Sequence, residues 1–120
     1  MTTIEMLQAK IHQPRVTSAD LNYEGSIGID VDIVKAAGMF INQKVLVVDI
    51  ENGNRFETYI IPAPGGSKKF QVNGAAARLV SAGDRLIIMG FVHTDYPPPS
   101  DWTPRILLMN SDNTIKETIG

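Results

Sequence analysis

Short runs of apolar and β-branched residues, separated by turn-forming residues, recur along this 120-residue chain and limit what it can fold into. In the first run Leu7, Ala9 and Ile11 alternate with polar residues, a period of two that is typical of a half-buried strand. Helical patterns are brief, so the sequence predicts a mainly β fold. The runs expected to form strands are Leu7–His12, Lys44–Ile50, Arg55–Ile61, Arg85–Thr94 and Arg105–Met109.

Turn-forming residues divide these runs. The pair Asn52-Gly53 between the second and third runs predicts a tight β-hairpin. We expect Pro14 to end the first strand, because proline cannot donate a hydrogen bond to a sheet. Glycine, proline and lysine make Pro62–Lys69 a loop, and the stiff Tyr96–Pro99 segment joins the last two strands.

Two short helices are expected. One ends at Ala37, with Asp30 or Asp32 as its cap and Gly38 as its stop. The other is a helical turn over Ala75–Val80. Many short strands with two small helices favour a closed β-barrel, which leaves no exposed strand edges. The length fits a single domain spanning residues 1–120.

Composition excludes several classes of protein. The chain has no cysteine and only two histidines, which argues against disulfides and against a metal site. A net charge of −2 disfavours nucleic-acid or anionic-membrane partners, since both attract basic surfaces. Neither a signal peptide nor a membrane-spanning run is visible, so we expect a cytoplasmic protein.

The dipeptide Gly25-Ser26 has two interpretations. The ordinary one is a flexible loop before a strand. The chemical one is self-cleavage, in which the Ser26 hydroxyl attacks the carbonyl of Gly25 and converts the peptide into an ester. Glycine leaves that carbonyl unshielded and tolerates unusual backbone angles. Elimination and hydrolysis would then leave a ketone-bearing pyruvoyl group.

Four polar side chains lie where they could bind or protonate an acidic ligand. Lys10 and His12 share one face of the first strand, and Arg55 and Tyr59 share one face of the third. A solvated strand surface is the commoner explanation for such residues. In the functional interpretation, the cations bind carboxylates, Arg55 with the geometry of its planar fork, and Tyr59 donates a proton.

Taken together and in order, the motifs of this chain resemble those of the bacterial pyruvoyl-dependent L-aspartate 1-decarboxylase family. The combination of ADLNYEGSIGID with NGAAARL is the most specific part of the resemblance, which extends over about the whole chain. The matching segments are Met6-Leu7 with Lys10–His12, Val16–Asp30, Asn52–Tyr59, Asn73–Asp84 and, more weakly, Thr103–Asn113.

The resemblance implies a double-psi β-barrel that forms a homotetramer, with active sites between neighbouring subunits. It implies self-cleavage between Gly25 and Ser26 into a β chain (1–25) and an α chain (26–120), and leaves open whether a maturation factor assists. The cofactor would be the pyruvoyl group derived from Ser26, with no metal and no pyridoxal phosphate. L-Aspartate would form a Schiff base with it and yield β-alanine and CO2 for pantothenate and coenzyme A synthesis.

The same resemblance implies roles for individual residues. Thr58 would assist cleavage, and Tyr59 would be the proton donor that acts beside the pyruvoyl group of Ser26. Two pocket members would have less defined roles, His12 and Tyr23. The residues expected to bind substrate are Lys10, Arg55, Thr58, Asn73, Gly74, Ala75, Ala76 and Ala77.

The chain departs from the family pattern at Gln13-Pro14, at Val48 and in the loop Ala63–Gly66.

Two other functions compete with a pyruvoyl-dependent aspartate decarboxylase. One is a non-catalytic β-barrel module in which Gly25-Ser26 stays intact, since a fold alone does not define chemistry. The other is a pyruvoyl decarboxylase for a different amino acid, although a neutral or basic substrate would leave Lys10 and Arg55 without an obvious purpose.

Overall fold

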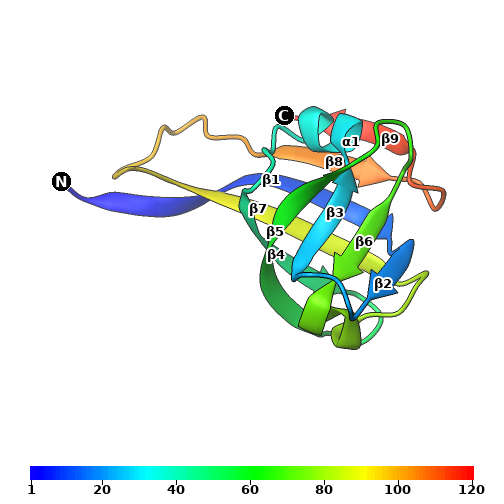
Figure 1. Ribbon diagram of the computed structural model, residues 1–120. Helices are drawn as coiled ribbons and strands as arrows, with labels where there is room; N and C mark the ends of the chain where they lie inside the picture. The colour runs from blue at the N-terminus through cyan, green and yellow to red at the C-terminus, as the bar shows by residue number, and fades with distance from the viewer.

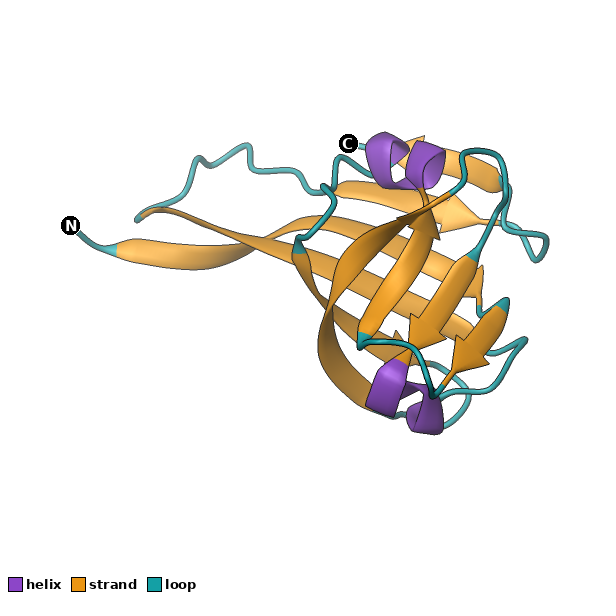
Figure 2. Ribbon diagram, viewed as in Figure 1, coloured by secondary structure: helices purple, strands orange, loops and turns teal.

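The computed structural model describes residues 1–120, which form one mixed sheet of nine strands and two short helices (Figures 1 and 2). The strand order is β2-β6-β3-β5-β4-β7-β1-β8-β9. The predicted mainly β class is confirmed. The elements are β1 (Thr3–Arg15), β2 (Ser18–Asp20), β3 (Ser26–Asp30), α1 (Val31–Ala36), β4 (Lys44–Asp49), β5 (Arg55–Ala63), β6 (Phe70–Asn73), the 3-10 helix η1 (Gly74–Leu79), β7 (Arg85–Asp95), β8 (Arg105–Met109) and β9 (Ile115–Ile119).

The sheet curls around one apolar core, and alternation along each strand decides which side chains enter it. Ile11, Val47 and Ile88 lie in one row across β1, β4 and β7, and all three are fully buried. Their neighbours along the strands point to the outer face. Phe70 of β6 is also fully buried in this core. Neither helix is long and apolar enough to cross a membrane.

A two-stranded arm projects from the body of the molecule (Figure 1). It consists of the first residues of β1 and the last residues of β7, paired from Thr3 with Asp95 to Leu7 with Phe91. Strand β8 pairs with β1 only between Ala9 and His12, so the arm has no third strand. The N-terminus lies at the tip of the arm (Figure 1).

Several local predictions are confirmed. The β4–β5 hairpin forms around Gly53, whose positive φ of 76° suits glycine in a tight turn. Helix α1 is capped by the Asp30 carboxylate, which accepts a hydrogen bond from the backbone N–H of Asp32 at 2.8 Å. Gly38 follows the helix at a φ of 72°. The 3-10 helix η1 occupies the position of the second predicted helix.

The prediction that Pro14 ends the first strand is wrong. Strand β1 continues to Arg15, which pairs with Arg85 across a register shift that begins after His12. Gln13 has a φ of 67° within this irregularity. A bulge interrupts the regular ladder, so a residue without an N–H is tolerated there. Strands β2, β6 and β9 were not predicted from the sequence, and β3 was predicted only as a strand, without bounds, after the Gly25-Ser26 loop.

A buried carboxylate lies where β4 leads into the hairpin turn. Asp49 is fully buried, and its Oδ1 accepts a hydrogen bond from the backbone N–H of Glu51 at 2.8 Å. Its Oδ2 has no donor. Burial, followed by the neighbouring carboxyl of Asp84, raises the pKa of Asp49 to about 6. Protonated Asp49 could donate to Asp84, which accounts for the oxygen without a partner.

Asp49→Asn should therefore remove a pH-dependent part of the stability. The folded-state pKa lies above the unfolded value near 3.8, so proton uptake by Asp49 stabilises the fold below about pH 4, and this contribution is lost as pH rises through about 6. The amide can donate to Asp84 at any pH. We expect Asp49→Asn to raise the free energy of unfolding at pH 7.5 by roughly 1–2 kcal/mol relative to the parent, with a smaller gain at pH 4.5.

Urea unfolding at fixed protein concentration, followed by the fluorescence of Trp102, measures this difference. Exposed Asp101→Asn is the control and should change stability equally little at both pH values. An equal gain for Asp49→Asn at pH 4.5 and pH 7.5 would contradict the assignment.

Candidate functional site

Ser26 begins strand β3 and is held on both sides of that strand. It pairs with Asn73 of β6, and the next residue, Ile27, pairs with Ile60 of β5. The Ser26 side chain is 1% exposed. Its hydroxyl accepts a hydrogen bond from Asn73 Nδ2 at 3.0 Å and donates to the carbonyl of Glu24 at 3.3 Å. The hydroxyl is therefore immobilised directly after the exposed residue that precedes the strand.

That preceding residue, Gly25, packs closely against Gly74. An added Cβ at Gly74 would lie 2.7 Å from the Cα and 2.9 Å from the nitrogen of Gly25. Gly74 also has a φ of 75°, a conformation that side chains disfavour. Its position directly after Asn73 therefore requires glycine for two separate reasons. The same Asn73-Gly74 step supplies the hydrogen bond to Ser26 and the contact with Gly25.

Two residues of β5, Tyr59 and Thr58, were expected to act at Ser26, and they point to opposite faces of the sheet. Ile27 and Ile60 are fully buried, so Ser26 and Tyr59, which immediately precede them, point to the outer face. Tyr59 is 39% exposed. Thr58 is half-buried on the opposite face of β5, where it opposes Val45, and it makes no hydrogen bond with Ser26.

Two small hollows lie beside Ser26. One of about 340 Å³ is lined by Lys44, Glu57, Thr58 and Tyr59. The other, of about 170 Å³, includes Asn73, Gln71, Lys69 and Tyr23 among its walls. Of the residues expected at the site, Thr58 and Tyr59 line the first hollow, and Tyr23 and Asn73 line the second, whereas Ser26 lines neither. Ala75, Ala76 and Ala77 follow Gly74 directly in η1 and line neither hollow.

The predicted cations do not reach Ser26 within one chain. Lys10 of β1 faces Met89 of β7, Met89 faces Leu46 of β4, and Leu46 faces Glu57 of β5. Three strand spacings separate Lys10 from β5, roughly 14 Å, and β3 lies one strand further. These side chains point away from the core, so the curl of the sheet increases the separation. Arg55 lies at the start of β5, four residues before Tyr59.

His12 lies in the row next to Lys10 on the same outer face, where it faces Ile87. Burial, followed by the positive charge of Lys10, lowers the pKa of His12 below its ordinary value. Its Nδ1 is buried without a hydrogen-bond partner. Around neutral pH the neutral imidazole is thus favoured.

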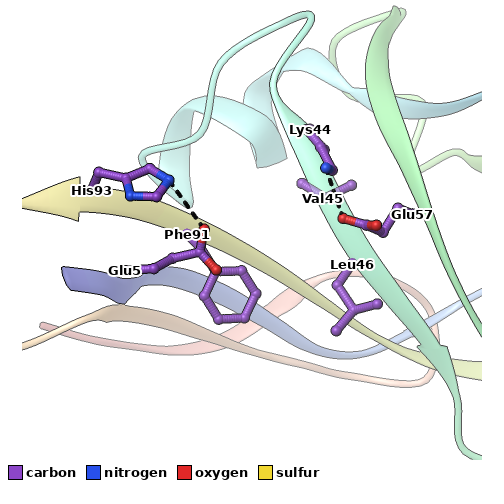
Figure 3. A pocket seen from close by; sticks show the side chains of 7 residues that line it. All are labelled: Glu5, Lys44, Val45, Leu46, Glu57, Phe91 and His93. Carbon is purple, nitrogen blue, oxygen red and sulfur yellow. Dashed lines mark ion pairs between the residues drawn. The ribbon is translucent and has the colours of Figure 1, made fainter. Parts of the chain in front are cut away.

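A third hollow, larger than these two, lies away from Ser26. It has a volume of about 490 Å³ and opens between the arm and strands β4 and β5 (Figure 3). Two ion pairs lie on its walls, Lys44 with Glu57 at 3.0 Å between β4 and β5, and His93 with Glu5 at 3.3 Å within the arm (Figure 3). Each charged group there already has a partner. No group of three or more histidine, aspartate or glutamate side chains is placed to hold a metal ion.

Comparison with known proteins identifies the family. The family described as aspartate decarboxylase matches residues 1–116 of the chain. The chain belongs to this family. The resemblance found in the sequence is thereby confirmed, and with it the prediction that the protein is an enzyme, a decarboxylase.

Individual relatives agree. An aspartate 1-decarboxylase of Fervidobacterium nodosum is 54% identical over 112 residues, which cover 93% of this chain and 95% of that protein. One from Thermosipho africanus is 51% identical over 93% of this chain and 92% of its own length. One from Clostridium beijerinckii is 48% identical over 95% and 92% of the respective chains.

Sequence reasoning missed one residue beside the family motifs. Gln71 Nε2 donates a hydrogen bond to Asn73 Oδ1 at 2.9 Å. A glutamine two positions before the NGAAARL motif resembles any polar strand residue, so the sequence holds no signal for this contact. The proximity of Gly74 to Gly25 was missed for the same reason, since the two are far apart in the chain.

Substituting Gly74 should test the close contact with Gly25. Gly74→Ala combines a disfavoured positive φ with a clash against backbone atoms that cannot move aside easily, so we expect a loss of about 2–3 kcal/mol in the free energy of unfolding. Gly66→Ala is the matched control, because Gly66 has a φ of 80° but no atom within 4 Å of the added Cβ. Its cost should be about 1 kcal/mol.

Both substitutions are made in chains that also carry Ser26→Ala, so that the bond after Gly25 stays intact. Chemical unfolding then compares the two directly. Equal losses for Gly74→Ala and Gly66→Ala would show that the contact with Gly25 is not tight.

Proposed function

We propose that this chain is a proenzyme that cleaves itself between Gly25 and Ser26 and then converts L-aspartate to β-alanine and CO2. The observation that carries the proposal is the buried Ser26 hydroxyl, hydrogen-bonded to Asn73 and to the carbonyl of Glu24 directly after the exposed Gly25. Family membership supports the same reaction. Its product is a precursor in pantothenate synthesis.

Self-cleavage needs only groups that the chain contains, and water. Ser26 Oγ forms a bond to the Gly25 carbonyl carbon while the Gly25–Ser26 C–N bond breaks, and the hydroxyl proton ends on the freed nitrogen. The resulting ester loses a proton from the Ser26 Cα, and its Cβ–Oγ bond breaks to release the Gly25 carboxylate. Water then replaces the nitrogen as ammonia, leaving a pyruvoyl group at position 26. Thr58 is proposed to assist the first of these steps.

The pyruvoyl group would be held at the start of β3 and would supply an electron sink for the electrons released with CO2. Arg55 binds a substrate carboxylate through its planar fork, and Lys10 contributes a second positive charge. Fixing the carboxylates determines which carbon–carbon bond is aligned for cleavage. Tyr59, which points to the same outer face as Ser26, delivers a proton to the former α-carbon.

We propose a homotetramer whose active sites lie between subunits. The separation of roughly 14 Å between Lys10 and β5 supports this, because a lysine side chain cannot bridge it within one chain. Another copy could bring Lys10 and His12 to Ser26. Apolar side chains lie between the two sets of polar residues on the outer face, among them Leu46, Met89 and the exposed Phe91, and such surfaces favour association.

The curled sheet is proposed to be a double-psi β-barrel. Its mixture of pairings supports this topology, because β3 with β5, β2 with β6 and β1 with β8 are parallel, whereas the intervening pairs are antiparallel.

The first prediction concerns cleavage. Purified protein, after warm incubation, should separate on a denaturing gel into Met1–Gly25 and the remainder of the chain, and intact mass should show that the larger piece starts with a pyruvoyl group. Ser26→Ala should stay intact because it lacks the nucleophilic oxygen. A parent chain that remains whole, with or without a cell extract to supply a maturation factor, argues against the proposed function.

The second prediction separates binding from chemistry. Tyr59→Phe should lower kcat by roughly 10²–10⁴ with little change in KM, the usual scale for loss of a general acid. Arg55→Lys keeps the charge but loses the planar fork, so KM should rise and turnover should slow while self-cleavage continues. Single-turnover kinetics on fully cleaved variants measures both effects. A parental rate for Tyr59→Phe would assign the proton to another donor.

The third prediction concerns assembly. Light scattering at micromolar concentration should report four copies of the chain, with both cleavage fragments retained. A stable monomer that decarboxylates aspartate would rule out a shared site.

A further inference from the structure

We infer that Gln71 is a positioning residue for self-cleavage, which holds the Asn73 amide so that its nitrogen faces Ser26 Oγ. The inference rests on the proposed self-cleavage at Ser26. Gln71 itself touches neither Ser26 nor the bond that breaks. It acts on the reaction only through Asn73.

Four groups form a chain of hydrogen bonds that runs in one direction. Gln71 Nε2 donates to Asn73 Oδ1 at 2.9 Å, and Asn73 Nδ2 donates to Ser26 Oγ at 3.0 Å. Ser26 Oγ donates in turn to the carbonyl of Glu24 at 3.3 Å. The Glu24 carbonyl can only accept, which directs the serine proton toward it and leaves Oγ free to accept from Asn73.

The orientation of Asn73 depends on its partners because its shape does not determine it. The two ends of a side-chain amide are nearly the same size, so rotating the amide by half a turn changes the hydrogen bonds and little else. Asn73 is 1% exposed, so an end without a partner there is costly. Gln71 provides the donor that the oxygen end requires. Without that donor, the rotated amide, with its oxygen facing Ser26, competes.

The orientation matters because Ser26 Oγ carries negative charge twice during the proposed reaction. The first occasion is when the hydroxyl loses its proton and attacks the Gly25 carbonyl. The second is when the Cβ–Oγ bond breaks and its electron pair leaves with the Gly25 carboxylate. An N–H donor on Oγ stabilises both states, whereas a carbonyl oxygen in its place would repel them.

The sheet register places Gln71 within reach of Asn73. Ser26 faces Asn73 and Gly28 faces Gln71 across the β3–β6 ladder, so all four residues share the outer face. Gly28 has no side chain, and nothing from β3 competes for the space into which Gln71 turns. Gln71 is half-buried and lines the smaller hollow beside Ser26.

Substitutions at position 71 can separate hydrogen-bond direction from packing. Gln71→Lys keeps a hydrogen-bond donor. Gln71→Met keeps the bulk of the side chain but neither donates nor accepts a hydrogen bond. Gln71→Glu, when ionised, can only accept. Gln43→Met is the matched control, since Gln43 Nε2 also donates to a side-chain amide, that of Gln8, at 2.8 Å, but outside this site. Full-length proenzyme isolated soon after synthesis at low temperature is warmed, and the intact fraction is followed by mass spectrometry, with the melting temperature of each variant measured alongside.

We expect the parent, Gln43→Met and Gln71→Lys to cleave at similar rates. Gln71→Glu should be slowed about a hundredfold at pH 8, the lower end of the range for losing an oriented donor, and Gln71→Met roughly tenfold, because Asn73 can still adopt the productive orientation part of the time. Cleavage of Gln71→Glu should recover relative to the parent as pH falls toward 4.5, because a protonated glutamate can donate again. This recovery is measured within one variant, so it remains decisive if another variant folds poorly.

If the parent cleaves normally, two results would overturn the inference about Gln71 and leave the proposed function standing. One is a parental rate for both Gln71→Met and Gln71→Glu. The other is equal slowing of Gln71→Lys and Gln71→Glu without pH recovery, which would indicate packing rather than hydrogen-bond direction. A parent that never cleaves would overturn the proposed function, and this inference with it.

Discussion

Strand β3 is paired on both sides, and the geometry around Ser26 depends on that pairing. Its parallel ladder with β5 and its antiparallel ladder with β6 bury all five of its residues. The ladder holds the Ser26 hydroxyl in place, whereas Gly25 lies just outside it in an exposed turn. The ladder therefore fixes the nucleophile, whereas Gly25 is positioned by its close packing against Gly74.

The alternation that builds the core also distributes the polar residues of the site. Each strand sends every second side chain inward, and the intervening ones, including Lys10, His12, Arg55 and Tyr59, face outward. One chain thus displays all of them on its surface but spreads them over several strands. The proposed contacts between subunits would bring together what the sheet separates, and they would do so without altering the core.

Local features could be predicted from the sequence, whereas features that depend on distant partners could not. The hairpin at Asn52-Gly53 and the caps of α1 follow from residues only a few positions apart. Strand β6 is four residues long and exists through its pairing with β2 and β3, so no periodic pattern revealed it. Pro14 is tolerated because of a register shift opposite Arg85, which a sequence does not display.

At the site, the motif around Ser26 could be predicted because its residues are contiguous in the sequence. The separation of roughly 14 Å between Lys10 and β5 could not be predicted, because it depends on the strand order. The role inferred for Gln71 required the sheet register, since only the ladder with β3 reveals that it reaches Asn73.

The position of β1 within the sheet has a consequence for how the protein would persist after a cut at Gly25. This strand is paired with β7 from Thr3 to Arg15 and with β8 in its middle, so the longer strand of the fragment would lie inside the sheet, and only the three-residue β2 would lie at its edge. Once severed, it would be a separate molecule, and its return after unfolding would become a bimolecular encounter that dilution disfavours. The mature protein would then persist because its barrier to unfolding is high, and not because it refolds easily.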